Sequence, residues 1–195
     1  MEHKYYWAGL ENGKKIYDKC IELAKNSDCK KRKFGCIIAA KEIAIMAPGE
    51  PDIISVWGEG YNHKVCGLEN FNCCKERANI ASGTRTEYCG AIHAETMALQ
   101  DLIRHAHDAS NFSNITLYVA GLNGDGSFFD NSKGFYCLPC AKELIHAGIP
   151  KIALASLETP KTGVWSMRTI NKAVSESLKF TKGTKKVDYD ANFGR

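Results

Sequence analysis

Two short fragments far apart in the chain constrain its fold most: His93-Ala94-Glu95 and, downstream, Cys137-Leu138-Pro139-Cys140. Together they offer an imidazole, two thiols and a carboxylate. An imidazole and two thiolates are an attested set of three protein ligands for zinc, which leaves the fourth position open for water. A Glu two residues after the His is poorly placed to bind the same ion, so it can act as a proton shuttle. The pattern predicts a fold that brings both fragments to one metal ion.

Each fragment is followed by residues with helical spacing. Residues 96–103 and 141–148 continue the two fragments with apolar side chains on one face, and Gly148 is typical of a helix end. Two helix N-termini would then converge on the ion, and their partial positive charge favours the thiolate forms of the cysteines. Either fragment alone is a weak signal, because a single Cys-x-x-Cys also occurs in redox pairs and structural zinc sites.

Apolar patterns along the chain predict an alternation of helices and strands, which is typical of an α/β sandwich. One domain is expected over residues 1–181, followed by a polar tail over residues 182–195. Residues 121–134, rich in Gly, Asn, Asp and Ser, are expected to form a loop. Helices are predicted at 13–25, from 94, from 138 and at 166–180, and strands at 34–40, 53–57, 115–120 and 151–156.

The composition excludes several classes of protein. No apolar run approaches the roughly 18 residues of a membrane helix, and the N-terminus lacks the pattern of a secretory signal. A cytoplasmic protein without membrane partners is therefore expected. In such a protein nine cysteines indicate metal binding more often than disulfides. The formal net charge of +4 is small, so a nucleic-acid partner is not expected.

A second group of metal-binding side chains lies upstream of His93. Four of its five members would complete a closed tetrahedral zinc site, which stabilises a fold without doing chemistry. The alternative is that its cysteines are ordinary buried thiols. Cys20, Cys29 and Cys36 are interpreted as core positions without a function. The five candidates are His63, Cys66, Cys73, Cys74 and Cys89.

A basic run, Lys30-Lys31-Arg32-Lys33, precedes the first predicted strand. Such runs are usually solvated turns. They can also supply the cationic donors that the dianion of a nucleotide monophosphate requires.

From about residue 16 to residue 155 the chain resembles the deoxycytidylate (dCMP) deaminases of the cytidine deaminase-like superfamily. The superfamily signature is H-x-E followed by P-C-x-x-C. The segment from Cys73 to Glu95 resembles the bacterial and phage branch, which carries a second, cysteine-rich metal site. The resemblance implies a three-layer α/β/α sandwich with a mixed central sheet. It is carried further by residues 27–38, Gly60-Tyr61-Asn62, residues 116–119 and residues 141–149.

The resemblance also implies roles for individual residues. It implies hydrolytic deamination at C4 of a cytosine ring, most simply of dCMP to dUMP, with Glu95 protonating N3 and helping ammonia to leave. Cys73 is favoured over Cys74 by its distance from Ser82-Gly83. The implied ligands of the catalytic zinc are His93, Cys137 and Cys140; those of a possible structural zinc are His63, Cys66, Cys73 and Cys89; and the substrate contacts are Asn62, Lys31, Arg32 and Ala94.

The chain departs from the family pattern at several places where substrate would be recognised. Tyr136 stands where the family has Pro directly before the first cysteine of the pair, and a proline follows inside the motif at Pro139. Residues 121–134 and about 41–57 are insertions, and His63 replaces the Gly that usually follows Gly-Tyr-Asn. These departures are compatible with an altered substrate.

Two other functions stay open at this stage. One is a deaminase of another nucleobase, a modified pyrimidine nucleotide or a tRNA adenosine. The other is a non-enzymatic zinc protein that binds a nucleotide as a sensor, although a closed structural site would have no use for Glu95. The resemblance also implies a homo-oligomer, such as a hexamer, and leaves open whether dCTP activates the protein and dTTP inhibits it.

Overall fold

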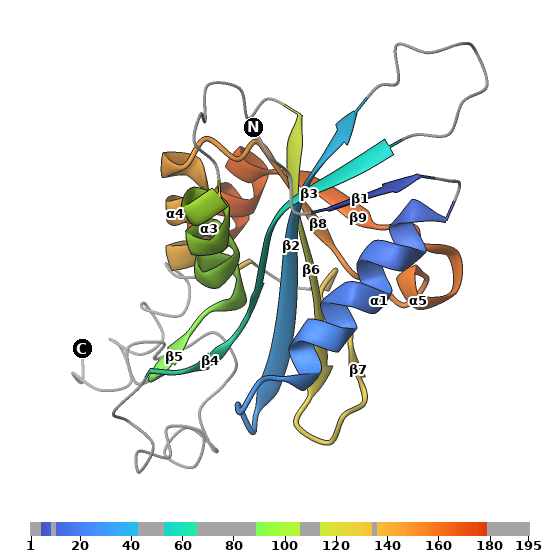
Figure 1. The fold of residues 1–195 in the computed structure, drawn as a ribbon. Helices are drawn as coiled ribbons and strands as arrows, with labels where there is room; N and C mark the ends of the chain where they lie inside the picture. Colours follow the sequence, from blue (N-terminus) through green and yellow to red (C-terminus); the bar gives the residue numbers. More distant parts are fainter. Residues whose placement is uncertain are drawn as a thin grey trace.

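The computed structural model describes residues 5–8, 11–42, 53–65, 89–105, 114–133 and 136–178. In this part of the chain a central sheet lies between two layers of helices (Figure 1). The strands of the main sheet are β1 (Tyr5–Ala8), β2 (Arg32–Glu42), β3 (Ile53–Tyr61), β6 (Ile115–Asn123), β7 (Phe128–Phe129), β8 (Lys151–Leu154) and β9 (Ser166–Thr169). The helices are α1 (Asn12–Lys25), α3 (Ala94–His105), α4 (Leu138–His146), α5 (Thr159–Thr162) and a segment at 170–178.

The main sheet is mixed, as the sequence predicts. Its strand order is β1-β3-β2-β6-β8-β9, with β7 paired to β6. Strands β6 and β8 run parallel, and the other neighbours are antiparallel. Figure 1 shows α3 and α4 on one face of this sheet and α1 and α5 on the other. The α/β/α sandwich is therefore confirmed. A separate two-stranded sheet joins β4 (His63–Lys64) to β5 (Ala91–Ile92).

Strand β2 is buried on both faces because helices cover both sides of the sheet. Cys36 and Ile38 belong to the core cluster that includes side chains of α3 and α4, whereas Ile37 and Ala39 pack in the cluster with α1. All four side chains are essentially inaccessible to solvent. This placement follows the two-residue period of a strand, and it explains why β2 reads as a continuous apolar run.

Helix α3 lies directly on β3, because glycine leaves room for its backbone. A Cβ atom added at Gly60 would lie 2.4 Å from the carbonyl oxygen of Ala94 and 2.4 Å from the amide nitrogen of Ala98. A side chain at position 60 would therefore push the first turn of α3 away from the sheet. The close approach fixes the position of the helix that begins directly after His93.

The last predicted helix is partly wrong. Residues 166–169 form β9, which pairs antiparallel with β8, and the helix begins only at residue 170. The side chains of β9 alternate between half-buried and exposed, as expected of an edge strand. The backbone N–H and C=O groups of β9 form hydrogen bonds with β8. Helical spacing within residues 166–180 could not predict this pairing, because it depends on another strand.

The expected loop at 121–134 is also partly wrong. Strand β6 continues to Asn123, and Phe128–Phe129 returns along it as β7. Gly126 takes a φ of 87° in the connecting turn, a conformation that glycine adopts without strain. The aromatic rings hold the hairpin down: Phe128 lies 6.1 Å from Tyr17 and Phe129 lies 5.8 Å from Phe34, between ring centroids.

The remaining helices and strands predicted from the sequence are confirmed to within four residues at their ends. Gly148 has a positive φ of 76° directly after the end of α4, as expected of a helix stop. The predicted tail at 182–195 lies outside the described residues. In the described part of the chain, no helix has the length and apolar character needed to cross a membrane.

Candidate functional site

The two predicted metal-binding fragments meet in the structure. The Nδ1 atom of His93 lies 3.0 Å from Sγ of Cys140 and 3.4 Å from Sγ of Cys137. Across the described residues, these three form the one group of three or more His, Cys, Asp and Glu whose donor atoms all lie within 4.8 Å of one another. In the sequence, His93 is separated from Cys137 by 44 residues and from Cys140 by 47, so only the tertiary fold brings them together.

Local structure explains how each donor is presented. His93 directly precedes α3, and Cys137 is the N-cap residue of α4. Cys140 lies in the first turn of α4, after Pro139, whose missing N–H is tolerated at this position because first-turn amides have no partner within the helix. Figure 1 shows α3 and α4 side by side on the same face of the sheet. The positive ends of both helices therefore lie at the cluster.

The donor set fits zinc. Zinc bonds of about 2.0 Å to nitrogen and about 2.3 Å to sulfur, at a tetrahedral angle, separate the two donor atoms by about 3.5 Å. The observed separations of 3.0 and 3.4 Å are close to this value. A set of one imidazole and two thiols is also typical of a zinc site with one open position.

The three donors strongly shift one another's pKa values. Hydrogen bonds to Cys137 and then to Cys89 raise the pKa of His93 to about 11. The pKa of Cys137 falls to about 5, because Cys140 and then His93 stabilise its thiolate, although burial opposes this. The hydrogen bond to Cys137, together with burial, raises the pKa of Cys140 well above its ordinary value. Among the three donors, Cys137 is therefore the one whose thiolate is most strongly favoured, and His93 is the one whose protonated form is favoured.

Zinc binding is expected to release about two protons per ion near pH 6.5, because a ligated imidazole is neutral and a ligated cysteine is a thiolate. The protons come from His93 and Cys140, whose pKa values are raised, whereas Cys137 with a pKa of about 5 is already ionised. Between about pH 6 and pH 9 the apparent zinc affinity should thus rise about 100-fold per pH unit. Titration calorimetry of the metal-free protein in buffers of different ionisation enthalpy measures this proton count, and a count near zero would contradict it.

Glu95 lies beside the cluster on the first turn of α3. Its side chain is buried, with 7% of its surface exposed. Burial raises the pKa of its carboxyl, and the nearby His93 partly opposes the rise. A carboxyl whose pKa is shifted toward neutrality can take up and return a proton at the pH of catalysis. The arrangement places a buried carboxyl next to the three donors and distinct from them.

Tyr136, which sequence reasoning singled out only as a departure from the family motif, lies at this site. Its side chain is 5% exposed and packs in the cluster that includes Ala94 and Cys140. Among the residues that the structure describes, its hydroxyl has no partner in standard hydrogen-bond geometry. Burial, and then the negative charge of Glu95, raise the pKa of Tyr136 well above its ordinary value. The one available sequence signal was the replacement of the family's proline.

Asn62 joins the ends of two strands near the cluster. It precedes His63, whose partner across the small sheet is Ile92, the residue before His93. Its Oδ1 accepts a hydrogen bond of 2.6 Å from the amide of Phe34, and its Nδ2 donates one of 3.0 Å to the carbonyl of Arg32. One lone pair and one amide hydrogen of this side chain stay available for a ligand.

The basic run lies next to Asn62, because Arg32 is the first residue of β2 and its carbonyl accepts the Asn62 hydrogen bond. The guanidinium carbon of Arg32 lies 3.7 Å from the ring centroid of Phe129, a cation–π contact that fixes the side chain. The carbonyl of Lys31 accepts a hydrogen bond of 3.1 Å from Gly124 in the β6–β7 turn. The hairpin insertion thus contacts the two residues for which a phosphate role was predicted. Ala94, the remaining predicted substrate contact, is fully buried.

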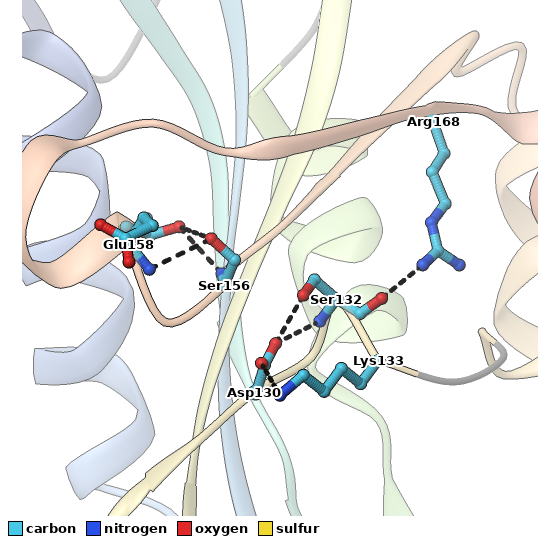
Figure 2. A network of polar contacts seen from close by, with 7 residues as sticks. Asp130, Ser132, Lys133, Ser156, Glu158 and Arg168 are labelled. Atoms are coloured by element: carbon cyan, nitrogen blue, oxygen red, sulfur yellow. Dashed lines mark hydrogen bonds and ion pairs between the residues drawn. The ribbon is translucent and has the colours of Figure 1, made fainter.

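Beyond the hairpin, the insertion is tied to the rest of the fold (Figure 2). Ser132 donates hydrogen bonds from its amide and hydroxyl to the Asp130 carboxylate, at 3.0 and 2.6 Å. Arg168 of β9 donates a hydrogen bond of 2.6 Å to the Ser132 carbonyl and pairs with Glu176 at 2.7 Å. Asp130 and Ser132 lie seven and five residues before Cys137, so these contacts hold the segment that leads to the second half of the metal cluster.

The residues predicted for a second zinc are only partly described. Cys66 and Cys73 lie outside the described residues. The ring nitrogens of His63 lie 2.7 Å from the Lys64 carbonyl oxygen and 3.4 Å from Sδ of Met97. Cys89 interacts with His93 and raises its pKa. The second zinc site therefore stays a prediction.

Comparison with known proteins agrees with this geometry. Residues 10–156 match the family model described as "Cytidine and deoxycytidylate deaminase zinc-binding region". Two solved structures that resemble the chain are mutant forms of cytidine deaminase from Mycobacterium tuberculosis. One has 12% identity and a TM-score of 0.39, covering 81% of this chain and 90% of that chain. The other has 14% identity and a TM-score of 0.36, covering 72% and 81%. The search of curated proteins finds no significant match.

Proposed function

The chain belongs to the family defined by the cytidine and deoxycytidylate deaminase zinc-binding region, and from this premise we propose that it hydrolyses dCMP to dUMP and ammonia. The observation that carries the proposal is the meeting of His93, Cys137 and Cys140 within 4.8 Å, beside a buried Glu95. A purely structural zinc site has four protein ligands and no need of an adjacent proton carrier. Among the described residues the site has three such donors, and the Glu95 carboxyl supports the role of proton carrier.

Zinc bound by the three donors would supply Lewis-acid chemistry, the activation of a water molecule near neutral pH. The rest of the reaction falls to the protein. A C–O bond forms at C4 of the cytosine ring, and the bond from C4 to the exocyclic nitrogen breaks. Glu95 accepts the first proton of the water and donates it to N3; it then accepts the proton of the new C4 hydroxyl and passes it to the exocyclic nitrogen, so that the C4 carbonyl forms as neutral ammonia leaves. Burial supports this role because it raises the pKa of the Glu95 carboxyl.

The choice of a monophosphate is supported by Lys31, Arg32 and Asn62, which lie together where β2 begins and β3 ends. Arg32 presents a guanidinium that stacks on Phe129 and is therefore restrained. A restrained guanidinium binds a phosphate dianion with less loss of side-chain entropy than a free one. The available amide hydrogen and lone pair of Asn62 suit the hydroxyl groups of a sugar.

The substrate is tested by measuring ammonia release from dCMP, deoxycytidine, CMP, dCTP, cytosine and adenosine. We expect the largest kcat/KM for dCMP. Removing the phosphate, as in deoxycytidine, should reduce kcat/KM by about 10- to 100-fold if one or two charge-assisted hydrogen bonds are lost. Equal rates for dCMP and deoxycytidine would exclude the phosphate role of Lys31 and Arg32. Ammonia release from none of these compounds would contradict the proposed reaction.

The resemblance extends the proposal to a homo-oligomer regulated by dCTP and dTTP, and to a second zinc held by His63, Cys66, Cys73 and Cys89. Sedimentation with and without each nucleotide tests the first part. Metal analysis of the purified protein tests the second, since two zinc ions per chain are expected with the structural site and one without it.

A further inference from the structure

The C-terminal part of the described chain contacts the backbone that leads into Cys137. The hydroxyl of Ser177, on the helical segment 170–178, donates a hydrogen bond to the Tyr136 carbonyl. The same hydroxyl oxygen lies 2.7 Å from the carbonyl oxygen of Ala173, one turn earlier in its own helix. Ser177 is 1% exposed and Tyr136 is 5% exposed, so water does not compete for the contact. A backbone group one residue before a predicted zinc ligand is therefore held by a tertiary hydrogen bond.

A second contact holds the chain four residues earlier. One terminal nitrogen of Arg168, on β9, lies 2.7 Å from the Glu176 carboxylate. The other donates a hydrogen bond of 2.6 Å to the Ser132 carbonyl (Figure 2). Glu176 directly precedes Ser177, so the ion pair joins β9 to the helix that makes the first contact. We call Arg168, Glu176 and Ser177 the C-terminal clamp, because together they bind the chain at residues 132 and 136.

The C-terminal clamp is anchored in the core of the protein. Strand β9 pairs with β8, and the amide of Ile170 donates a hydrogen bond of 3.0 Å to the Pro150 carbonyl. Ile170 and Ala173 belong to the same buried cluster as Cys140 and Leu144 of α4. The helix that carries Ser177 and the helix that carries Cys140 are therefore parts of one packed unit. A residue that fixes the position of another group requires such support.

The sequence around the contact gives a reason for it. Tyr136 stands where the family signature has proline directly before the first cysteine. A proline ring fixes its backbone φ at about −65°, whereas tyrosine leaves this angle free. The chain thus lacks a covalent restraint at this position and has a tertiary restraint in its place. All three residues of the C-terminal clamp lie beyond residue 156, where the match to the family model ends.

We propose that Ser177, supported by Arg168 and Glu176, is a positioning residue that fixes the backbone before Cys137 and so presets this ligand for zinc. The role requires no contact with the metal or with the substrate. A ligand that is held in place before zinc arrives loses less conformational freedom on binding, so the zinc affinity rises. The inference rests on the zinc site of the proposed function and is independent of which nucleotide is the substrate.

The test is Ser177→Ala, which removes one hydroxyl and keeps the helix, because alanine is the strongest helix former. Zinc affinity is measured by titrating a chromogenic chelator into the zinc-loaded protein, and a Cys140→Ala protein identifies the ion that belongs to this cluster. We expect the dissociation constant of that ion to rise about 10-fold, the lower end of the range for loss of an outer contact of a metal ligand. The increase in melting temperature that zinc produces should shrink accordingly.

Thr159→Val is the matched control. Thr159 is fully buried on α5, on the opposite face of the sheet from α3 and α4, and its hydroxyl donates a hydrogen bond of 2.6 Å to the Val164 carbonyl. The replacement removes the same kind of buried contact, so it should lower the melting temperature. Its zinc dissociation constant should equal that of wild type. If Ser177 had a structural role alone, the two variants would bind zinc equally well.

Arg168→Met tests the other half of the C-terminal clamp and decides the question if Ser177→Ala yields no folded protein. It removes the contact with the Ser132 carbonyl and should also weaken zinc binding. The control is Arg104→Met, a change at an exposed position near the end of α3, which should bind zinc like wild type.

The outcomes separate this inference from the proposed function. Equal zinc dissociation constants in Ser177→Ala, Arg168→Met and wild type overturn the positioning role, and so does an equal loss of affinity in Thr159→Val. A wild type that holds zinc at the cluster but releases no ammonia from any tested compound contradicts the proposed function, while the affinity comparison still decides the role of Ser177. A wild type that binds no zinc at the cluster contradicts both.

Discussion

Replacing Glu95 by Gln is expected to reduce kcat by about 10²- to 10⁴-fold, the range for removal of a general acid–base. Glutamine has nearly the same shape but cannot carry a proton between water, ring and leaving nitrogen. The amide also removes a buried carboxyl whose pKa is raised by burial, so folding should not suffer. Zinc should remain bound, because Glu95 is outside the group of three donors.

Turnover and metal content of the purified variant are measured together. Glu22→Gln is the matched control, since Glu22 lies exposed on α1 and pairs with Lys19 at 2.9 Å on the outer surface. The control should turn over like wild type. A Glu95→Gln protein that keeps more than a tenth of wild-type kcat with zinc bound would falsify the assignment of Glu95 as proton carrier.

Replacing Cys140 by Ala is expected to remove one zinc ion per chain and to reduce turnover to background. The change leaves two donors, His93 and Cys137, at a site whose three donor atoms otherwise lie within 4.8 Å of one another. Structural zinc sites contribute about 10–16 kcal/mol of apparent binding free energy, so the loss of a ligand changes occupancy decisively. The Cys137 thiolate also loses Cys140, the partner that contributes most to its lowered pKa.

Metal analysis and melting temperature check this result. Chelation should lower the melting temperature of wild type by more than that of Cys140→Ala, because only the former has this zinc to lose. Cys20→Ala is the control, because Cys20 is a buried cysteine of α1 outside the group of three donors. Burial raises the pKa of its thiol. Its replacement should keep zinc. Equal zinc content in Cys140→Ala and wild type would show that the three donors do not share an ion.

Much of the fold was predictable because its signals are local. The helix at 12–25 and the strand pair β2–β3 follow from apolar periodicity within short windows. The strand β9 and the hairpin β6–β7 were not predictable in this way. Both depend on pairing with a strand that is distant in the sequence or on aromatic rings that pack against other elements, as Phe129 does on Arg32. Tertiary contacts override weak local preference in such segments.

The sequence by itself determined which residues can serve as metal donors and which carboxylate can move a proton, because donor chemistry belongs to residue types and their spacing. The tertiary structure alone decided that His93, Cys137 and Cys140 approach within 4.8 Å, and that Tyr136 and Glu95 are buried. The physical reason is that distance and burial depend on how helices pack on the sheet. The close approach of α3 to Gly60 and the hydrogen bond from Ser177 to the Tyr136 carbonyl are tertiary contacts, which no local sequence pattern predicts.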